Sequence, residues 1–222
     1  MNLTPAPVSE GSLCHVFDLI GQHLPPELMN AESFAHTRKV ADLFAVEDVD
    51  FFGFEARLGA ATSNSTDCAL NLSRHGARAM EQGVWSSQGG SWPLIAEFYR
   101  HWGATHVDPF ADAPATWLEF DCTEATPAPN LMFGYFPDDA NSDRPWTWMQ
   151  DVVLSDLFRG AYGQTLRAGV DRVFQALPAG TGDLQIGVML SRPLQALRLC
   201  VFDVEPDRVP SVLKSIDWPG HL

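Results

Sequence analysis

Basic residues are scarce in this chain. Its 222 residues include 14 lysines and arginines against 28 aspartates and glutamates, which gives a formal net charge of -14. The basic residues are spread singly along the sequence, whereas binding to a polyanion requires a local concentration of cations. We therefore expect neither DNA, RNA nor a membrane as a partner.

Long hydrophobic runs are also missing. No apolar stretch of about 18 residues is present, and the first residues, MNLTPAPVSEGS, have neither the basic nor the apolar segment of a secretion signal. The composition is nevertheless 45% hydrophobic, which is sufficient for a core. These observations predict a soluble, acidic protein of the cytoplasm. The final DWPGHL is a turn signal, and a longer natural chain stays an open alternative.

Motifs that hold metals and cofactors are absent as well. Cys14, Cys68, Cys122 and Cys200 lie far apart with no CxxC pair, and we expect them to be buried thiols. The sequence contains no GxxxxGK[ST] loop, no strand followed by GxGxxG, no GxSxG and no HExxH. We therefore expect no nucleotide cofactor held by a standard loop, and we assign no cofactor and no metal.

The pattern of apolar residues predicts an α+β protein. Short runs with a period of two come in pairs, and each pair is followed by a stretch with helical character. This order favours an antiparallel sheet built from successive strand-strand-helix units, with the helices packed on one face. The expected strands span 49–59, 66–74, 115–124, 130–137, 184–192 and 196–204, and the expected helices span 92–102, 145–177 with a break near Gly160 and Gly163, and 207–216.

No linker divides the chain, so residues 1–222 are expected to form one domain. Residues 1–12 form a loose arm, residues 13–47 supply N-terminal helices, and residues 48–222 supply the sheet with its helices. Pro25 and Pro26 end the first helix, and Asn30 is the expected N-cap of the second.

The stretch LSRHGARA at 72–79 offers one candidate site. Arg74, His75, Gly76 and Arg78 resemble the RHGxR signature of the histidine phosphatases. That resemblance implies a nucleophilic His75, with Arg74 and Arg78 clamping a phosphate. The family also requires a later histidine beside an acid, and the near matches are His106 with Asp108 and His221, close to the end of the sequence. The interpretation we favour is a strand that leaves the core at Ser73 and turns at Gly76.

A second group of polar residues has the donor types of a metal site. Glu97, His101, His106 and Asp108 lie within EFYRHWGATHVDPF. On a helix, Glu97 and His101 fall opposite the apolar face, so they form a surface pair at positions i and i+4. We therefore predict a surface pair followed by a loop, with no metal.

The strand ATWLEFDCTE gives the leading candidate for chemistry. A period of two places Leu118, Phe120 and Cys122 on one face and Trp117, Glu119 and Asp121 on the other. Two carboxylates about 7 Å apart suit an acid and base pair, and Trp117 could form a platform for a ligand. If this face is buried, both acids need partners, for which Arg57 and Arg198 are the candidates. The alternative is a strand face that is simply wet.

Aromatic residues supply the last signal. Trp146 and Trp148 stand two positions apart in PWTWMQ, so at the start of a helix they cannot both face the same core. One of them is expected to face a groove or a partner. The leading hypothesis is binding of a small organic molecule or peptide in an aromatic pocket, with carboxylate chemistry at Glu119 and Asp121. The alternatives are a non-catalytic interaction subunit that docks a protein partner, and a phosphatase at Arg74, His75 and Arg78.

Overall fold

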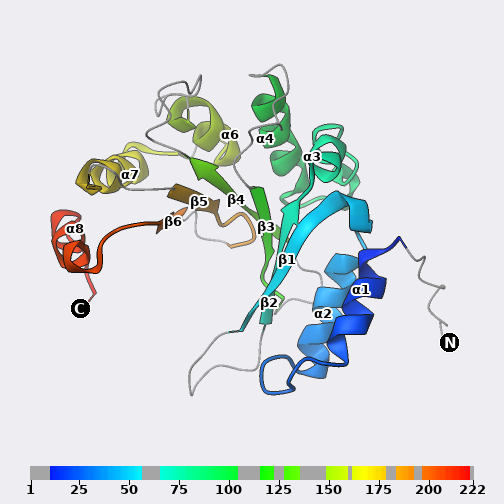
Figure 1. Cartoon of the computed structure of the whole chain (residues 1–222). Coiled ribbons are helices and arrows are strands. Elements are labelled where there is room, and N and C mark those ends of the chain that lie inside the picture. The colour runs from blue at the N-terminus through cyan, green and yellow to red at the C-terminus, as the bar shows by residue number, and fades with distance from the viewer. Residues whose placement is uncertain are drawn as a thin grey trace.

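The computed structural model describes residues 11–56, 66–104, 116–122, 128–135, 149–159, 162–178, 184–192 and 197–220. Within these ranges the chain is an α+β protein with a six-stranded antiparallel sheet, as the sequence predicts. The strands lie side by side in chain order, so each one pairs with the next (Figure 1). They are β1 (Val49–Ala56), β2 (Thr66–Leu72), β3 (Thr116–Phe120), β4 (Pro129–Tyr135), β5 (Leu184–Val188) and β6 (Leu197–Val201).

Helices precede, separate and follow the pairs of strands. In Figure 1, α1 and α2 lie beside β1 and β2, while α7 and α8 lie at the opposite end of the sheet. The α-helices are α1 (Leu13–Gly21), α2 (Ala31–Ala41), α3 (Arg74–Glu81), α4 (Trp92–Ala104), α6 (Ser155–Leu157), α7 (Gln164–Ala176) and α8 (Val209–Ser215). The remaining helical turns are η1 (Val46–Asp48), η2 (Ser86–Gln88), a π-helix η3 (Met149–Leu154) and η4 (Pro206–Arg208).

Two faces of the sheet follow from the register of the strands. Leu70 lies opposite Leu118, which lies opposite Leu131, and this row continues to Val188. We call the face that carries this row the inner face. Side chains alternate along a strand, so Trp117 and Glu119 belong to the other face, which we call the outer face.

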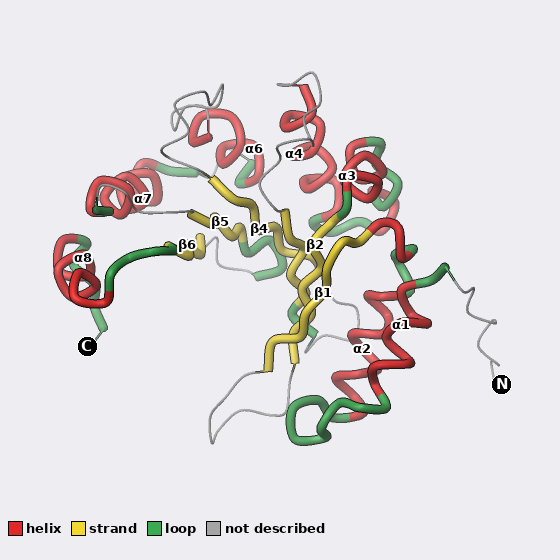
Figure 2. The backbone as a smooth tube through the Cα atoms, in the orientation of Figure 1, coloured by secondary structure: helices red, strands yellow, loops and turns green. Residues whose placement is uncertain are grey.

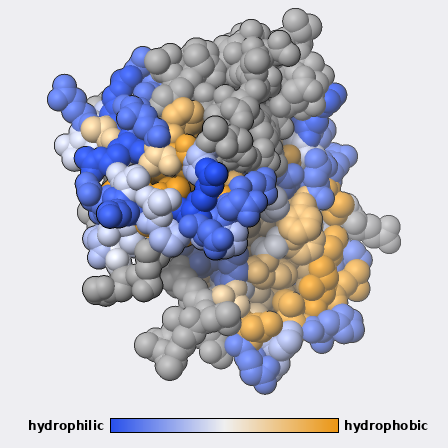
Figure 3. Space-filling model, turned by 60° about the vertical axis from the view of Figure 1, so that its left-hand side comes forward, coloured by the Kyte–Doolittle hydropathy of each residue, from blue (hydrophilic) through white to orange (hydrophobic). Residues whose placement is uncertain are grey.

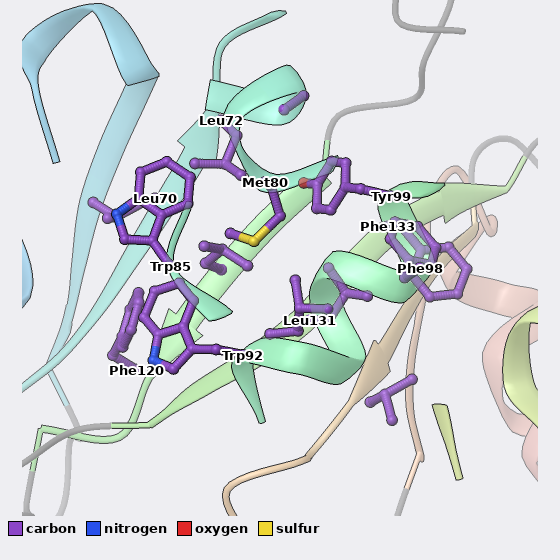
Figure 4. Close-up of a cluster of buried hydrophobic side chains, with 14 of the residues drawn as sticks. Leu70, Leu72, Met80, Trp85, Trp92, Phe98, Tyr99, Phe120, Leu131 and Phe133 are labelled. Atoms are coloured by element: carbon purple, nitrogen blue, oxygen red, sulfur yellow. The ribbon is translucent and has the colours of Figure 1, made fainter. Parts of the chain in front are cut away.

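The inner face carries the main core, which Figure 4 shows in close-up. Leu70, Leu118 and Phe133 are all fully buried. Described helices contribute aromatic rings to the same core. The ring centroids of Phe17 in α1 and Phe52 in β1 are 4.9 Å apart, and those of Phe98 in α4 and Phe133 in β4 are 5.0 Å apart. Apolar burial of this extent is the main source of folding free energy.

Burial declines toward the last strand. Leu118 in β3 and Ile186 in β5 have no exposed surface, whereas every residue of β6 is only partly buried. Helix α8 has no buried residue, although it contacts α7. Figure 2 shows α7 and α8 beyond β6, at the end of the sheet away from α1 and α2. The β6 edge of the sheet and α8 therefore contribute less to the core than the inner strands do.

One short helix differs from the expectation. Strand β2 ends at Leu72, and the expected turn at Gly76 was wrong because α3 begins at Arg74. Ser73 caps this helix, since its hydroxyl oxygen accepts a hydrogen bond of 3.1 Å from the amide of Gly76. Gly76 packs against η1 so closely that a β-carbon there would collide with the carbonyl oxygen of Asp48. Tertiary contact at a glycine thus favours a helix where the sequence suggests a turn.

Candidate functional site

Glu119 is a buried acid on the outer face. Its side chain is 1% exposed, and both of its carboxylate oxygens accept hydrogen bonds from Nη1 of Arg198, at 3.0 and 2.8 Å. Arg198 belongs to β6, so the pair spans the two intervening strands β4 and β5. Neighbouring strands are about 4.8 Å apart, and the two side chains together therefore cross about 14 Å of the sheet.

A glycine in β5 leaves room for this long contact. Gly187 lies opposite Arg198 on one side and Met132 on the other. A β-carbon at Gly187 would lie 3.2 Å from Cγ of Met132 and 3.3 Å from Cβ of Arg198. The bare backbone at Gly187 lets the arginine lie across the strand toward Glu119. This geometry makes the pair a connection between the edge and the centre of the sheet.

Burial raises the pKa of Glu119 above its usual range, because the charged form loses solvation. The charge of Arg198 opposes this shift, while the negative charge of Glu55 adds to it. The net effect is a carboxyl group that holds its proton more strongly than an exposed glutamate. A carboxyl group of this kind can act as an acid where a substrate reaches it.

Asp121 lies just beyond the end of β3 and has a different set of partners. Its carboxylate accepts two hydrogen bonds from Arg192, at 2.9 and 3.2 Å, and one of 2.9 Å from the hydroxyl of Ser191. The side-chain amide of Asn130 donates a longer one of 3.4 Å. Oδ1 of Asn130 in turn accepts from the amide of Ser191 at 2.8 Å. This network fixes the residues that follow β5 against the ends of β3 and β4.

The pKa of Asp121 is shifted in the opposite direction from that of Glu119. Burial by itself would raise the pKa, but the hydrogen bonds from Arg192 and Ser191 favour the charged form more strongly and hold the pKa below its usual range. Two carboxyl groups on neighbouring positions of one face thus have environments that separate their pKa values. Such a separation is typical of an acid paired with a permanently charged partner, although paired structural acids produce it too.

Trp117, the third predicted residue of this face, contacts an aromatic ring of β1. Its ring centroid is 5.5 Å from that of Phe51, and the planes meet edge to face. Phe51 is 59% exposed, so the aromatic pair borders solvent. The structure therefore places Trp117, Glu119 and Asp121 along one strand with separate partners: an aromatic ring, the arginine of β6 and the segment after β5. Of the other predicted residues, Arg57, Trp146 and Trp148 lie outside the described residues.

The RHGxR stretch lies at the start of α3 beside acidic residues. Nδ1 of His75 is 2.9 Å from Oδ1 of Asp48, and its Nε2 is 3.8 Å from Oε1 of Glu47. The side chain of His75 is 62% exposed. Arg74 and Arg78 are separated by one helical turn. Acids beside the histidine disfavour a bound phosphate, and the hydrogen bond to Asp48 gives His75 a structural partner instead.

The metal-type residues are only partly described. Glu97 forms an ion pair with Arg100, three positions further along α4, and the side chain of His101 lies outside the described part of the structure. His106 and Asp108 lie outside the described ranges. Within those ranges, no group of three or more histidine, cysteine, aspartate or glutamate residues is placed to hold a metal ion.

A cavity of about 480 Å³ lies next to the Asp121 network. We call it the α4–β5 cavity, because its walls come from the start of α4, the end of α6 and the residues that follow β5. Its lining combines apolar side chains, among them Phe158, with hydroxyl and guanidinium groups. Its lining includes Ser91, Leu94, Phe158, Arg159, Ser191 and Arg192.

Asp121 holds two residues of the cavity lining in place through hydrogen bonds. It does not line the cavity, but it is bonded to Ser191 and Arg192, which do. Nε and Nη2 of Arg192 donate hydrogen bonds to Asp121, while Nη1 of Arg192 bonds to no described residue. Ser191, Arg192 and Arg159 were not among the predicted site residues. The one signal for Arg192 was its place at the end of a predicted strand, in LSR at 190–192.

A second concave surface is apolar throughout. We call it the α7–α8 groove; it has a volume of about 480 Å³ and lies between α7, β6 and α8. Trp218 at its border is 55% exposed. Figure 3 shows hydrophobic residues gathered in separate areas of this side of the molecule, with hydrophilic residues between them. The groove is lined by valine, leucine, isoleucine and tryptophan, among them Val173, Leu177, Leu199, Val212, Leu213 and Trp218.

Comparisons with protein-family models, with curated proteins and with solved structures gave no match. No helix among the described residues has the length and apolar character needed to cross a membrane.

Proposed function

We propose that the protein binds a small organic molecule or short peptide in the α4–β5 cavity. The observation that carries this proposal is the cavity itself, whose volume of about 480 Å³ is within the usual range for small-molecule sites. Its lining combines apolar side chains with a few polar groups, which is the composition expected of such a site. Phe158 supplies the aromatic part of the pocket.

Asp121 acts in this proposal as a positioning residue. Its bonds to Arg192 and Ser191 fix the polar wall before a ligand arrives, so less side-chain freedom is lost on binding. Glu119 connects β6 to β3 through Arg198 and lines neither of the two described cavities. Binding is therefore better supported than acid and base chemistry at these two residues.

The proposal includes the finer arrangement of the fold. Repeated strand-strand-helix units with helices on the inner face would place α4 and α6 together over β4 and β5. The contact between α4 and α6 supports this arrangement. In this arrangement, the cavity forms where α4 and α6 meet the end of β5, at the border between the helices and the sheet.

A variant that fills the cavity tests this function. Ala128 lines the α4–β5 cavity, so Ala128→Trp should remove binding of small aromatic fragments, measured by ligand-observed NMR on the full chain. Ala168 is exposed on α7, and Ala168→Trp is the matched control, expected to bind as the unsubstituted protein does. Equal fragment binding by both variants would contradict the proposal.

A second candidate is favoured by the α7–α8 groove, namely docking of an amphipathic helix from a basic partner protein. An apolar groove accepts the apolar face of such a helix, and the net charge of -14 favours a partner with basic flanks. Leu213→Glu should abolish binding of a lysine-rich model helix, while Val84→Glu, at an exposed valine elsewhere, should not. Undiminished binding by Leu213→Glu would overturn this candidate.

A further inference from the structure

The lining of the α4–β5 cavity carries positive charge, although the protein as a whole is acidic. Two of the 14 basic residues, Arg159 and Arg192, line this one cavity. Among the described residues, ion pairs occupy Arg38, Arg100, Arg167, Arg172, Arg192 and Arg198. The side chain of Arg159, in contrast, forms no hydrogen bond or ion pair with a described residue, so its charge is available to a ligand.

The backbone of Arg159 has an unusual conformation. Its φ is 50°, in the left-handed region, directly after α6. Glycine or asparagine normally occupies such a position, and another residue there costs free energy. A strained residue that lines a cavity and carries an unused guanidinium group points to a role in the cavity rather than in the helix end.

The charge balance of the cavity defines the ligand. Arg192 is already neutralised in part by Asp121, which leaves Arg159 as the uncompensated cation of the lining. A single excess positive charge suits a monoanion better than a doubly charged phosphate. The planar guanidinium forks of two arginines also match the geometry of a carboxylate. The cavity lies at the start of α4 as well, where the helix dipole adds to the positive potential.

We propose that the α4–β5 cavity binds a carboxylate with an apolar body. Its oxygens lie between Arg159 and Nη1 of Arg192, and its body lies along Leu94, Leu157 and Phe158. This inference rests on the proposed function, because it names the ligand class of the same cavity. It assigns Arg159 the recognition of charge and Asp121 the positioning of the second arginine.

Isothermal titration calorimetry of the full chain tests the inference with matched pairs of acids and amides. The probes are 4-phenylbutyrate, octanoate and indole-3-butyrate, each beside its neutral amide, together with 2-phenylethyl phosphate. At least one acid should bind, about tenfold or more tighter than its amide and tighter than the phosphate. Arg159→Gln should weaken the binding of the acid about tenfold, which corresponds to about 1.4 kcal/mol, without weakening that of the amide.

Arg208→Gln is the control, because Arg208 is an exposed arginine of η4 that lines neither described cavity. It should bind the acid as the unsubstituted protein does. Amides that bind as tightly as their acids would overturn the carboxylate inference and leave the binding function intact. The same holds for an Arg159→Gln variant with unchanged affinity for the acid, or for tighter binding of the phosphate. If no acid and no amide binds, both the inference and the proposed function fail.

Discussion

The centre of the sheet and its β6 edge differ in how they are held. In the inner strands β2 and β3, Leu70 and Leu118 are fully buried beneath helices and aromatic rings. At the β6 edge, no residue of the strand or of α8 is buried, and the apolar groove between them borders solvent. Instead, β6 is tied to the sheet centre by the ion pair between Arg198 and Glu119.

This difference suggests a division of roles. Apolar burial stabilises the inner strands β2 and β3, whereas the β6 edge leaves apolar surface uncovered. Regions with few buried contacts open at a lower free energy than the core does. Such regions are also where a ligand or partner can gain the most by covering exposed apolar side chains. The difference in packing between the inner strands and the β6 edge can be tested by substitution.

The largest difference in stability is expected between a substitution in the core and one in the α7–α8 groove. Leu118→Ala should lower the free energy of unfolding by about 2–5 kcal/mol, because it leaves a cavity in a fully packed core. Leu213→Ala, in the exposed groove, should cost less than about 1 kcal/mol. Urea denaturation of both variants measures the difference. Similar losses of stability in both variants would show that the α7–α8 groove is as well packed as the core around Leu118.

The next effect concerns the ion pair that spans the sheet. Arg198→Ala leaves the buried carboxylate of Glu119 without its partner and should cost about 1–3 kcal/mol, discounted because the arginine is 36% exposed. The surface pair of Arg172 with Asp217 at the same end is the control, and Arg172→Ala should cost no more than about 0.5 kcal/mol. Hydrogen exchange should also become faster in β6 for Arg198→Ala. Unchanged exchange there would contradict a role of the pair in holding the strand.

The pH dependence of stability should separate the two carboxyl groups. The pKa of Glu119 is raised, so between the ordinary glutamate pKa and the raised value the folded chain binds more protons, and stability falls as pH rises. The pKa of Asp121 is lowered, so its contribution is present above the ordinary aspartate pKa and is lost as pH falls through the lowered value.

Two isosteric variants therefore act in opposite senses. Glu119→Gln should remove the fall in stability with rising pH, and Asp121→Asn should remove part of the loss in acid. Denaturation midpoints measured in urea from pH 3 to pH 7 test both expectations. A Glu119→Gln profile parallel to that of the unsubstituted protein would show that burial does not raise this pKa.

The smallest effect is a difference in thiol reactivity. Cys14, Cys68 and Cys122 are buried, whereas Cys200 in β6 is partly exposed. A disulfide reagent should first modify Cys200 in the folded protein, slowly, because burial raises the pKa of this thiol as well. Cys200→Ser should remove this early reaction and leave the three other thiols to react on unfolding. Early modification of Cys68 in β2 would contradict the contrast in burial between the inner strands and the β6 edge.

The strands could be predicted from the sequence because their apolar alternation is local. Helix α3 could not, since RHGARAME is short and mostly polar, and Gly76, Ala77 and Met80 are its buried residues. Its stability comes from the Ser73 cap and from the close contact of Gly76 with Asp48, which depend on segments distant in the sequence. The predicted N-cap at Asn30 was confirmed, because capping is a local interaction: Ser33 donates to its side chain at 2.8 Å.

The candidate site could be predicted only in part. Arg198 could be proposed as a partner of Glu119 because both lie in strands, and a buried acid requires a cation. Ser191 and Arg192 were missed, since they reach Asp121 from 70 and 71 positions away and follow the end of a strand. The lining of the cavity comes from distant segments, among them those around Leu94, Phe158 and Arg192, so no local pattern reveals it.

The order of the strands has a consequence for how the chain folds. The pairs β1–β2, β3–β4 and β5–β6 are each joined by a short connection, so each can close without waiting for a distant segment. The entropy lost in closing these loops is modest, whereas the β2–β3 and β4–β5 pairings close over segments that contain helices. The last strand to join pairs with β5 alone, so β6 can leave and return while every other pairing stays intact.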